Sequence, residues 1–342
     1  MAQVTLPKAF VDGFLIEWAE NEYEAQVVSN RQKSQEIRPT VRMSGSGALG
    51  AAKTRTPAER AQAVRDRLAR TVRKVPEVMV KITSACRGMK QIRQHIDYIS
   101  RKGQIDLEDQ DGHTIRGSEQ LKDLKADWRA GGPEEIGEDS TRRNTLNIVF
   151  SMPAHTDEVS MKRAVRAFAA GEFAGHQYVF AYHTQATDPD PSPPAHPHVH
   201  LAVKTLGWSG RRLNPRKADL QRWREGFAEQ LRSHGIEANA TTRLARLKNE
   251  RSAKRSVLAL VAKGEDLHSV GQGGGTARKF EAQQLEDRRK DYYRKVADVL
   301  TKSEDEADQG LAAEITEHFG LGRKRSATTG PALSKPDRER DR

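Results

Sequence analysis

The segment HPHVHLAV, residues 196–203, places three histidines within five positions, directly before an apolar run. The side chains of a β-strand alternate between the two faces of a sheet. His198 and His200 would therefore lie side by side on one face, while the valines and the leucine of the segment form the other. Pro197 lacks the N–H that a strand ladder needs, so His196 is expected to precede regular pairing.

The segments around this strand alternate between strand and helix patterns. Strands are predicted at 77–83, 144–152 and 176–184, helices at 89–102, 117–130, 157–171 and 216–234, and a hairpin near 111–112. Gly103 is expected to follow the first of these helices as its C′ residue. The segment LGWSGRRLN, residues 206–214, is typical of a turn into a short strand. This alternation with short connections indicates an α+β or α/β sandwich.

Composition divides the chain into four regions. Residues 1–75 are expected to form a partly disordered N-terminal extension, and residues 76–243 the folded domain. Residues 244–300 are predicted to form a charged helical region. Residues 301–342 are expected to be a disordered basic tail, because they are too polar to bury a core.

The overall charge points to a polyanionic partner. The chain has 342 residues and a net charge of +11, which favours nucleic acid, although a protein with basic tails would have the same charge. Its one cysteine, Cys86, excludes an intramolecular disulfide and any metal site with several cysteines, and suits a reducing cytoplasm. No apolar run reaches the roughly 18 residues of a membrane span, and the N-terminus lacks a signal-peptide pattern. We therefore expect no stable membrane insertion and no ordinary secretion.

The histidines of the strand are candidate metal ligands. Two neutral imidazoles at i and i+2 can reach one borderline ion such as Mn, Co, Ni, Cu or Zn. His183 lies near the end of the preceding predicted strand, so it would converge with His198 and His200 if the two strands are adjacent and antiparallel. An ion held by three histidines keeps open positions at which a phosphoryl oxygen can be polarised. The alternative is that each histidine is only a hydrogen-bonded or surface residue.

A tyrosine on the first core helix is the candidate nucleophile. At about 100° per residue, Met89, Ile92, Ile96 and Ile99 cluster on one side of the helix, and Tyr98 falls about 140° from that cluster. A phenol has a pKa of about 10, so a nearby cation or a base must assist its attack. Basic residues follow at 101 and 102 and could instead hold nucleic-acid phosphates. A tyrosine packed on the helix edge is the alternative interpretation.

These motifs together resemble a known family. HIDYISRKG at 95–103, FAYHT at 180–184 with the histidine strand, and HGIEANATTR at 234–243 resemble the conjugative relaxase, or mobilisation nuclease, family of the HUH type. The resemblance is to the T-DNA border endonuclease branch and covers about residues 78–243. It implies an α+β fold with a central, mainly antiparallel sheet flanked by helices, and flexible basic extensions at both ends.

The resemblance also implies a chemistry. Relaxases nick one strand at the transfer origin of a mobile element, become attached to the 5′ end through a phosphotyrosyl bond, and pilot the strand in conjugation. By position, Tyr98 resembles the nucleophile, and His183, His198 and His200 resemble the ligands of one divalent ion, Mn or Mg, with Zn, Co or Ni as alternatives. We expect Arg101 and Lys102 to contact DNA phosphates.

The implied partners are single-stranded DNA at an origin of transfer, relaxosome accessory proteins and a type IV coupling protein. The implied location is the bacterial cytoplasm, with export alongside DNA through a type IV secretion system. The basic tail could serve as the export signal, or it could be a solvated segment with general DNA affinity.

One position departs from the family pattern. Relatives often carry an acid two residues after the first histidine, where this chain has Gln185, and Asp188 or Asp190 could replace that acid in orienting a ligand. Two other functions remain open at the level of sequence. One is a rolling-circle replication initiator, whose histidine motif usually precedes its tyrosine helix, and the other is a non-catalytic, basic DNA-binding accessory protein.

Overall fold

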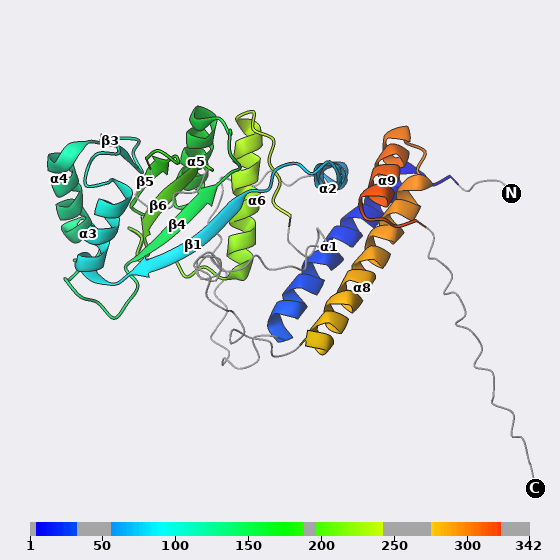
Figure 1. The fold of residues 1–342 in the computed structure, drawn as a ribbon, viewed down its shortest axis with the longest axis horizontal. Helices are drawn as coiled ribbons and strands as arrows, with labels where there is room; N and C mark the ends of the chain where they lie inside the picture. Colours follow the sequence, from blue (N-terminus) through cyan, green and yellow to red (C-terminus); the bar gives the residue numbers. More distant parts are fainter. Residues whose placement is uncertain (1–4, 33–55, 188–195, 242–274, 323–342) are drawn as a thin grey trace, which may run out of the picture. The chain divides into compact units, whose positions relative to one another are not determined.

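The computed structural model describes residues 5–32, 56–187, 196–241 and 275–322 (Figure 1). The chain divides into two compact units, one made of residues 1–18 with 249–342 and the other of residues 19–248. Among the described residues, no helix combines the length and the apolar composition needed to cross a lipid bilayer.

A six-stranded sheet forms the centre of the 19–248 unit. Its strands are β1 Met79–Cys86, β2 Leu107–Asp109, β3 Thr114–Ile115, β4 Thr145–Ser151, β5 Tyr178–His183 and β6 His198–Lys204. The order across the sheet is β1-β4-β6-β5-β2-β3, and every strand pairing is antiparallel. The histidine strand β6 therefore lies inside the sheet, and the predicted α+β fold with a mainly antiparallel sheet is confirmed.

Helices cover both faces of the sheet (Figure 1). The helices α5 Glu158–Glu172 and α6 Lys217–Ser233 pack on the face that carries Val199, Leu201 and Val203. The helices α3 Gly88–Ile99 and α4 Gly117–Ala130 pack on the opposite face. The alternation expected for residues 196–203 is confirmed, because the apolar members enter the α5–α6 core and Ala202 enters the α3–α4 core.

Part of the predicted N-terminal extension belongs to the 19–248 unit. Helix α2, Pro57–Val72, begins with a capping box between Thr56 and Glu59. The side-chain amide of Asn239 donates to the Thr71 hydroxyl at 3.3 Å, and the main chain of Asn239 pairs with residues 76 and 78. The fold therefore does not begin at residue 76, since α2 is bonded to the end of the predicted nuclease region.

The other unit is helical. It contains the first part of α1 Lys8–Gln32, up to Trp18, with α8 Gly275–Thr301 and α9 Glu306–His318. The expectation of a disordered tail from residue 301 is wrong for residues 301–322. Asp305 caps α9, which buries Leu311 and Ile315, while Phe319 stacks on Tyr293 at 4.0 Å between ring centroids. These apolar residues recur every four positions, which is the spacing of one helix face, and residues 323–342 lie outside the described part.

Candidate functional site

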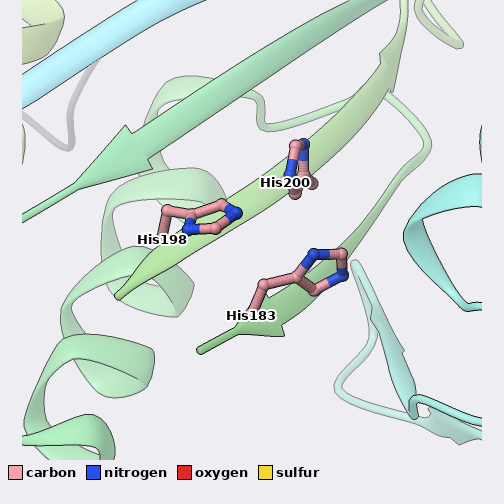
Figure 2. A group of neighbouring side chains, drawn as sticks. All are labelled: His183, His198 and His200. Carbon is pink, nitrogen blue, oxygen red and sulfur yellow. The ribbon is translucent and has the colours of Figure 1, made fainter. Parts of the chain in front are cut away.

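Three histidines from two neighbouring strands converge at one end of the sheet. His183, the last residue of β5, pairs with His198, the first residue of β6, and His200 follows on the same face. Their ring centroids lie 4.7–5.5 Å apart. One nitrogen from each ring lies within 4.8 Å of the others, and Figure 2 shows the three rings close together over the two strands. His196 lies before the strand and outside this group, as expected.

Burial keeps at least one of these imidazoles neutral. His183 is fully buried and His198 is only 4 % exposed. Desolvation lowers the pKa of His200 from 6.5 to about 2, with further lowering from neighbouring positive charge on His183, His198 and His95. At neutral pH, His200 therefore presents a lone pair rather than a second N–H, which is the form that binds metal.

Hydrogen bonds fix the tautomers of the other two rings. Nε2 of His183 lies 2.7 Å from the main-chain oxygen of Ile99, and Nδ1 of His198 lies 3.3 Å from that of His196. Because a carbonyl oxygen only accepts, each of these nitrogens must donate. In the neutral rings, Nδ1 of His183 and Nε2 of His198 carry the lone pairs. Three imidazole nitrogens within reach of one another fit a divalent ion of the Mn-to-Zn series, with the carbonyls orienting the rings.

A second group with metal-ligating atoms, Asp109, Asp111 and His113, lies on the β2–β3 hairpin. The Asp109 carboxylate accepts hydrogen bonds from the main-chain amides of Asp111 and His113, as aspartates commonly do in tight turns. This group is explained by the hairpin itself.

Tyr98 lies beside the histidines, on the α3 helix. Met89, Ile92, Ile96 and Ile99 are buried, whereas Tyr98 is 42 % exposed, so the predicted off-stripe position is confirmed. The Tyr98 ring meets the His200 ring edge-on, with 5.8 Å between centroids. The bond from His183 to the carbonyl of Ile99, the residue after Tyr98, joins the tyrosine helix to β5.

Two basic residues, Arg101 and Lys102, follow the end of the tyrosine helix. The α3 helix ends at the Ser100 cap, so the expectation that Gly103 is its C′ residue is wrong. Arg101 and Lys102 both adopt left-handed conformations, with φ of 48° and 56°. The Arg101 guanidinium donates to the main-chain oxygen of Thr187 at 3.4 Å, in the turn after β5. These two basic residues and Tyr98 line one open pocket. Its full lining is Gln94, Asp97, Tyr98, Arg101, Lys102 and Gln104.

Comparison with known proteins relates this chain to a family. Residues 98–236 match the model of the MobA/VirD2-like relaxase nuclease domain, and the match begins at Tyr98 and includes all three histidines. The resemblance to the relaxase family that the motifs predict is thereby confirmed over this region.

Curated relatives agree with this assignment. The chain is 30% identical over 189 residues to the T-DNA border endonuclease VirD2 of Rhizobium radiobacter, which is 50% of this chain and 43% of that protein. It is 29% identical over 194 residues to the protein of the same name from Agrobacterium fabrum, covering 51% and 42%. The chain thus spans less than half the length of the curated relatives that it matches.

Gln185 occupies the position at which relatives often carry an acid. Gln185 is exposed in the turn after β5. Asp188 and Asp190, the two expected substitutes, lie outside the described residues.

His95 is a feature of the candidate site that sequence analysis missed. Its ring lies 6.3 Å from the Tyr98 ring and nearly parallel to it, one helical turn earlier on α3. Its Nε2 is buried and accepts or donates no hydrogen bond within the described part of the chain. Desolvation lowers the pKa of His95 from 6.5 to about 4, so the ring is neutral at pH 7. The i−3 relation to Tyr98 was visible in the sequence, but the burial was not.

Acid should destabilise the fold through His95. Its folded-state pKa lies below its unfolded value, so between about pH 6.5 and 4 the unfolded chain binds more protons and stability falls as pH falls. One pKa unit corresponds to about 1.4 kcal/mol, so we expect a loss of up to about 2 kcal/mol at about pH 5. Urea unfolding of His95→Gln should show a weaker dependence on pH than the wild type. The same change at the exposed His113 should leave the dependence intact, and parallel curves for wild type and His95→Gln would contradict the assignment.

Proposed function

We propose that the chain is a site- and strand-specific DNA relaxase that nicks the transfer origin of a mobile element. The observation that carries the proposal is the placement of Tyr98, with its ring 5.8 Å from His200 in a group of three convergent histidines. The match of residues 98–236 to the relaxase nuclease domain supports it, as do relatives named border endonucleases.

In this proposal Tyr98 is the nucleophile of a transesterification. Its phenolic oxygen attacks the phosphorus at the nick site, and the bond from phosphorus to the 3′ oxygen breaks. The phenol loses a proton and the departing 3′ oxygen gains one, which leaves a 5′ phosphotyrosyl bond and a free 3′ hydroxyl. One phosphodiester replaces another, so the step is close to balanced in energy and can be reversed to rejoin the strand.

His183, His198 and His200 are the proposed ligands of one divalent ion, Mn or Mg, with Zn, Co or Ni as alternatives. When bound, such an ion would stabilise negative charge on the phosphoryl oxygens. The chain's own contribution is to hold three imidazole rings at one point, with His200 in its neutral form. Burial, the carbonyl of Ile99 and the carbonyl of His196 together provide this.

Arg101 and Lys102 are the proposed phosphate contacts. They share the open pocket with Tyr98, and their left-handed backbone brings two cationic side chains to the end of the tyrosine helix. A strand held there would have its scissile phosphate positioned against the phenol, which makes the attack effectively unimolecular. Positioning and electrostatic stabilisation are the main sources of rate in phosphoryl transfer.

A covalent adduct tests the proposed activity. Purified full-length protein is mixed with Mn or Mg and with labelled single-stranded oligonucleotides tiled across the non-coding regions of its own replicon. We expect one oligonucleotide to give a protein–DNA band that survives denaturation, with a new free 3′ end at one nucleotide. Cleavage without adduct, or adducts on every oligonucleotide alike, would exclude a site-specific tyrosine relaxase.

The proposed role extends to piloting the strand. Relaxosome accessory proteins and a type IV coupling protein are the proposed partners, with the bacterial cytoplasm as the site of nicking and a type IV secretion system as the route of export. The basic segment at 323–342 is the proposed signal. The alternative is that this segment only adds DNA affinity, and that alternative predicts a different phenotype when the segment is deleted.

Deletion of residues 323–342 separates these two roles. We expect transfer frequency in a mating assay to fall at least about tenfold, while adduct formation in vitro keeps its rate, because the residues proposed for nicking all lie between 98 and 200. Equal losses of transfer and of adduct would instead assign the segment to DNA binding.

A further inference from the structure

The turn that follows β6 exposes a tryptophan. Trp208 is 57 % exposed, whereas Trp18, Trp128 and Trp223 are at most 4 % exposed. An indole offers a large apolar surface, so one left in water at a fixed point on the surface often marks a contact. We call residues 205–213 the Trp208 turn.

The backbone of the Trp208 turn is held firmly. The amide of Trp208 donates to the carbonyl of Gly175 at 2.9 Å, and the amide of Leu213 donates to that of Thr205 at 2.7 Å. At Gly207 an added Cβ would lie 2.8 Å from the oxygen of Gly175, so the turn sits directly on the loop before β5. The indole is therefore presented from a fixed backbone.

Four exposed arginines lie in the Trp208 turn or in a loop bonded to it. Arg211 and Arg212 lie in the turn, and Arg142 and Arg143 lie in the neighbouring loop before β4; all four are exposed. The Arg212 guanidinium donates to the Thr205 hydroxyl at 3.1 Å and to the main-chain oxygen of Arg143 at 3.5 Å, which brings the two pairs together.

Few acids oppose this charge. Glu134 lies 3.7 Å from Arg212, and the neighbouring Glu135 is paired with Arg129 at 3.0 Å. In the described part of the chain, Glu134 is thus the one acid within ion-pairing distance of these four arginines.

The Trp208 turn lies at the far end of β6 from the histidines. His198 begins the strand and Lys204 ends it, and the turn follows directly. Seven residues at about 3.3 Å each separate the two ends by about 20 Å. Both lie in the 19–248 unit, so a single nucleic-acid strand can reach from one to the other.

We infer that the Trp208 turn is a second contact for single-stranded DNA, remote from the nick. Trp208 stacks on a base, and the four arginines contact flanking phosphates. The inference rests on the proposed function, which supplies single-stranded DNA as the ligand. A duplex hides the faces of its bases within the stack, whereas a single strand offers them to an aromatic ring, and surrounding arginines are the usual companions of such a ring.

Binding of a labelled oligothymidylate to the full-length protein tests the inference. Trp208→Ala is expected to weaken binding about five- to tenfold, at the low end of what base stacking on an exposed aromatic contributes. Trp208→Phe should retain most of the affinity, because it keeps an aromatic face. Phe10→Ala removes an aromatic side chain of similar exposure, 55 %, from the helical unit and should bind as the wild type does.

Two further readouts identify the contact. Acrylamide quenching of tryptophan fluorescence should decrease when DNA binds, and Trp208→Phe should lack this protection. Arg211→Gln should reduce the slope of log affinity against log salt by about 0.7, the value for one phosphate contact on a single strand. Unchanged affinity in Trp208→Ala, or quenching that DNA does not alter, would overturn the inference and leave the surface to another kind of partner.

The outcome is independent of the test of nicking. Normal DNA affinity in Trp208→Ala alongside a normal covalent adduct would remove the second contact and leave the relaxase. Weaker affinity in Trp208→Ala without any adduct on any oligonucleotide would remove the relaxase and leave a single-stranded DNA-binding surface.

Discussion

Tyr98→Phe should abolish the covalent protein–DNA adduct. The substitution removes one oxygen, and in the proposed reaction that oxygen forms the bond to phosphorus. Loss of a nucleophile typically lowers the rate by three orders of magnitude or more, so we expect no band on a denaturing gel at any time point. Because Tyr98 is 42 % exposed and its ring is retained, stability should stay within about 0.5 kcal/mol of the wild type.

A second tyrosine provides the control for this experiment. Tyr292 lies in the helical unit, where its ring stacks on Trp18 at 4.7 Å and its hydroxyl donates to the main-chain oxygen of Trp18. Tyr292→Phe also removes one phenolic oxygen, but far along the chain from the histidines, and should form the adduct at the wild-type rate. An undiminished adduct in Tyr98→Phe would show that another residue attacks the phosphate, and the proposed mechanism would fail.

The parts of the site that sequence analysis predicted correctly follow from local periodicity. His198 and His200 share a face because strand side chains alternate, and Tyr98 leaves the apolar stripe because helix positions advance by about 100°. The pairing of His183 with His198 needed one assumption, that consecutive strands are antiparallel neighbours, which is the most frequent arrangement.

The parts that were missed depend on contacts between distant segments. The end of α3 at its Ser100 cap was not evident from the sequence, because the charged residues that follow, Arg101 and Lys102, could equally continue a helix. His95 is polar, and only the packing of α3 on the sheet reveals that its Nε2 is buried. Likewise, α9 was assigned to a polar tail because its apolar residues are sparse, and they are buried only by packing within the helical unit.

Replacing His198 and His200 together by alanine should remove the bound metal. We expect about one divalent ion per chain in the wild type after dialysis against Mn, measured by mass spectrometry, and close to none in the double variant. Two of three nitrogen donors are lost, and even changes to groups that merely orient a ligand lower metal affinity by about 10- to 100-fold. The adduct should fall below detection, while circular dichroism reports whether the sheet is retained.

His196→Ala is the matched control for the double variant. It removes a histidine from the same segment, but this ring lies outside the convergent group, and the main-chain oxygen that orients His198 remains. Its metal content should match that of the wild type. Full metal content in the double variant would show that the ion binds elsewhere, and the three histidines would then be structural, as in a DNA-binding accessory protein.

Metal binding can also be read without any reaction. An ion that binds only the folded chain raises its stability by RT ln(1 + [M]/Kd), which is about 2.7 kcal/mol when the free ion is at about 100 times Kd. Adding Mn should therefore raise the melting temperature of the wild type and of Tyr98→Phe, but leave that of the double variant unchanged. This pattern separates the two roles at the site, since the tyrosine would be needed for the adduct alone and the histidines for both. Equal shifts in all three proteins would assign the metal to another site. The absence of any shift in the wild type would argue that these imidazoles, although convergent, hold no ion.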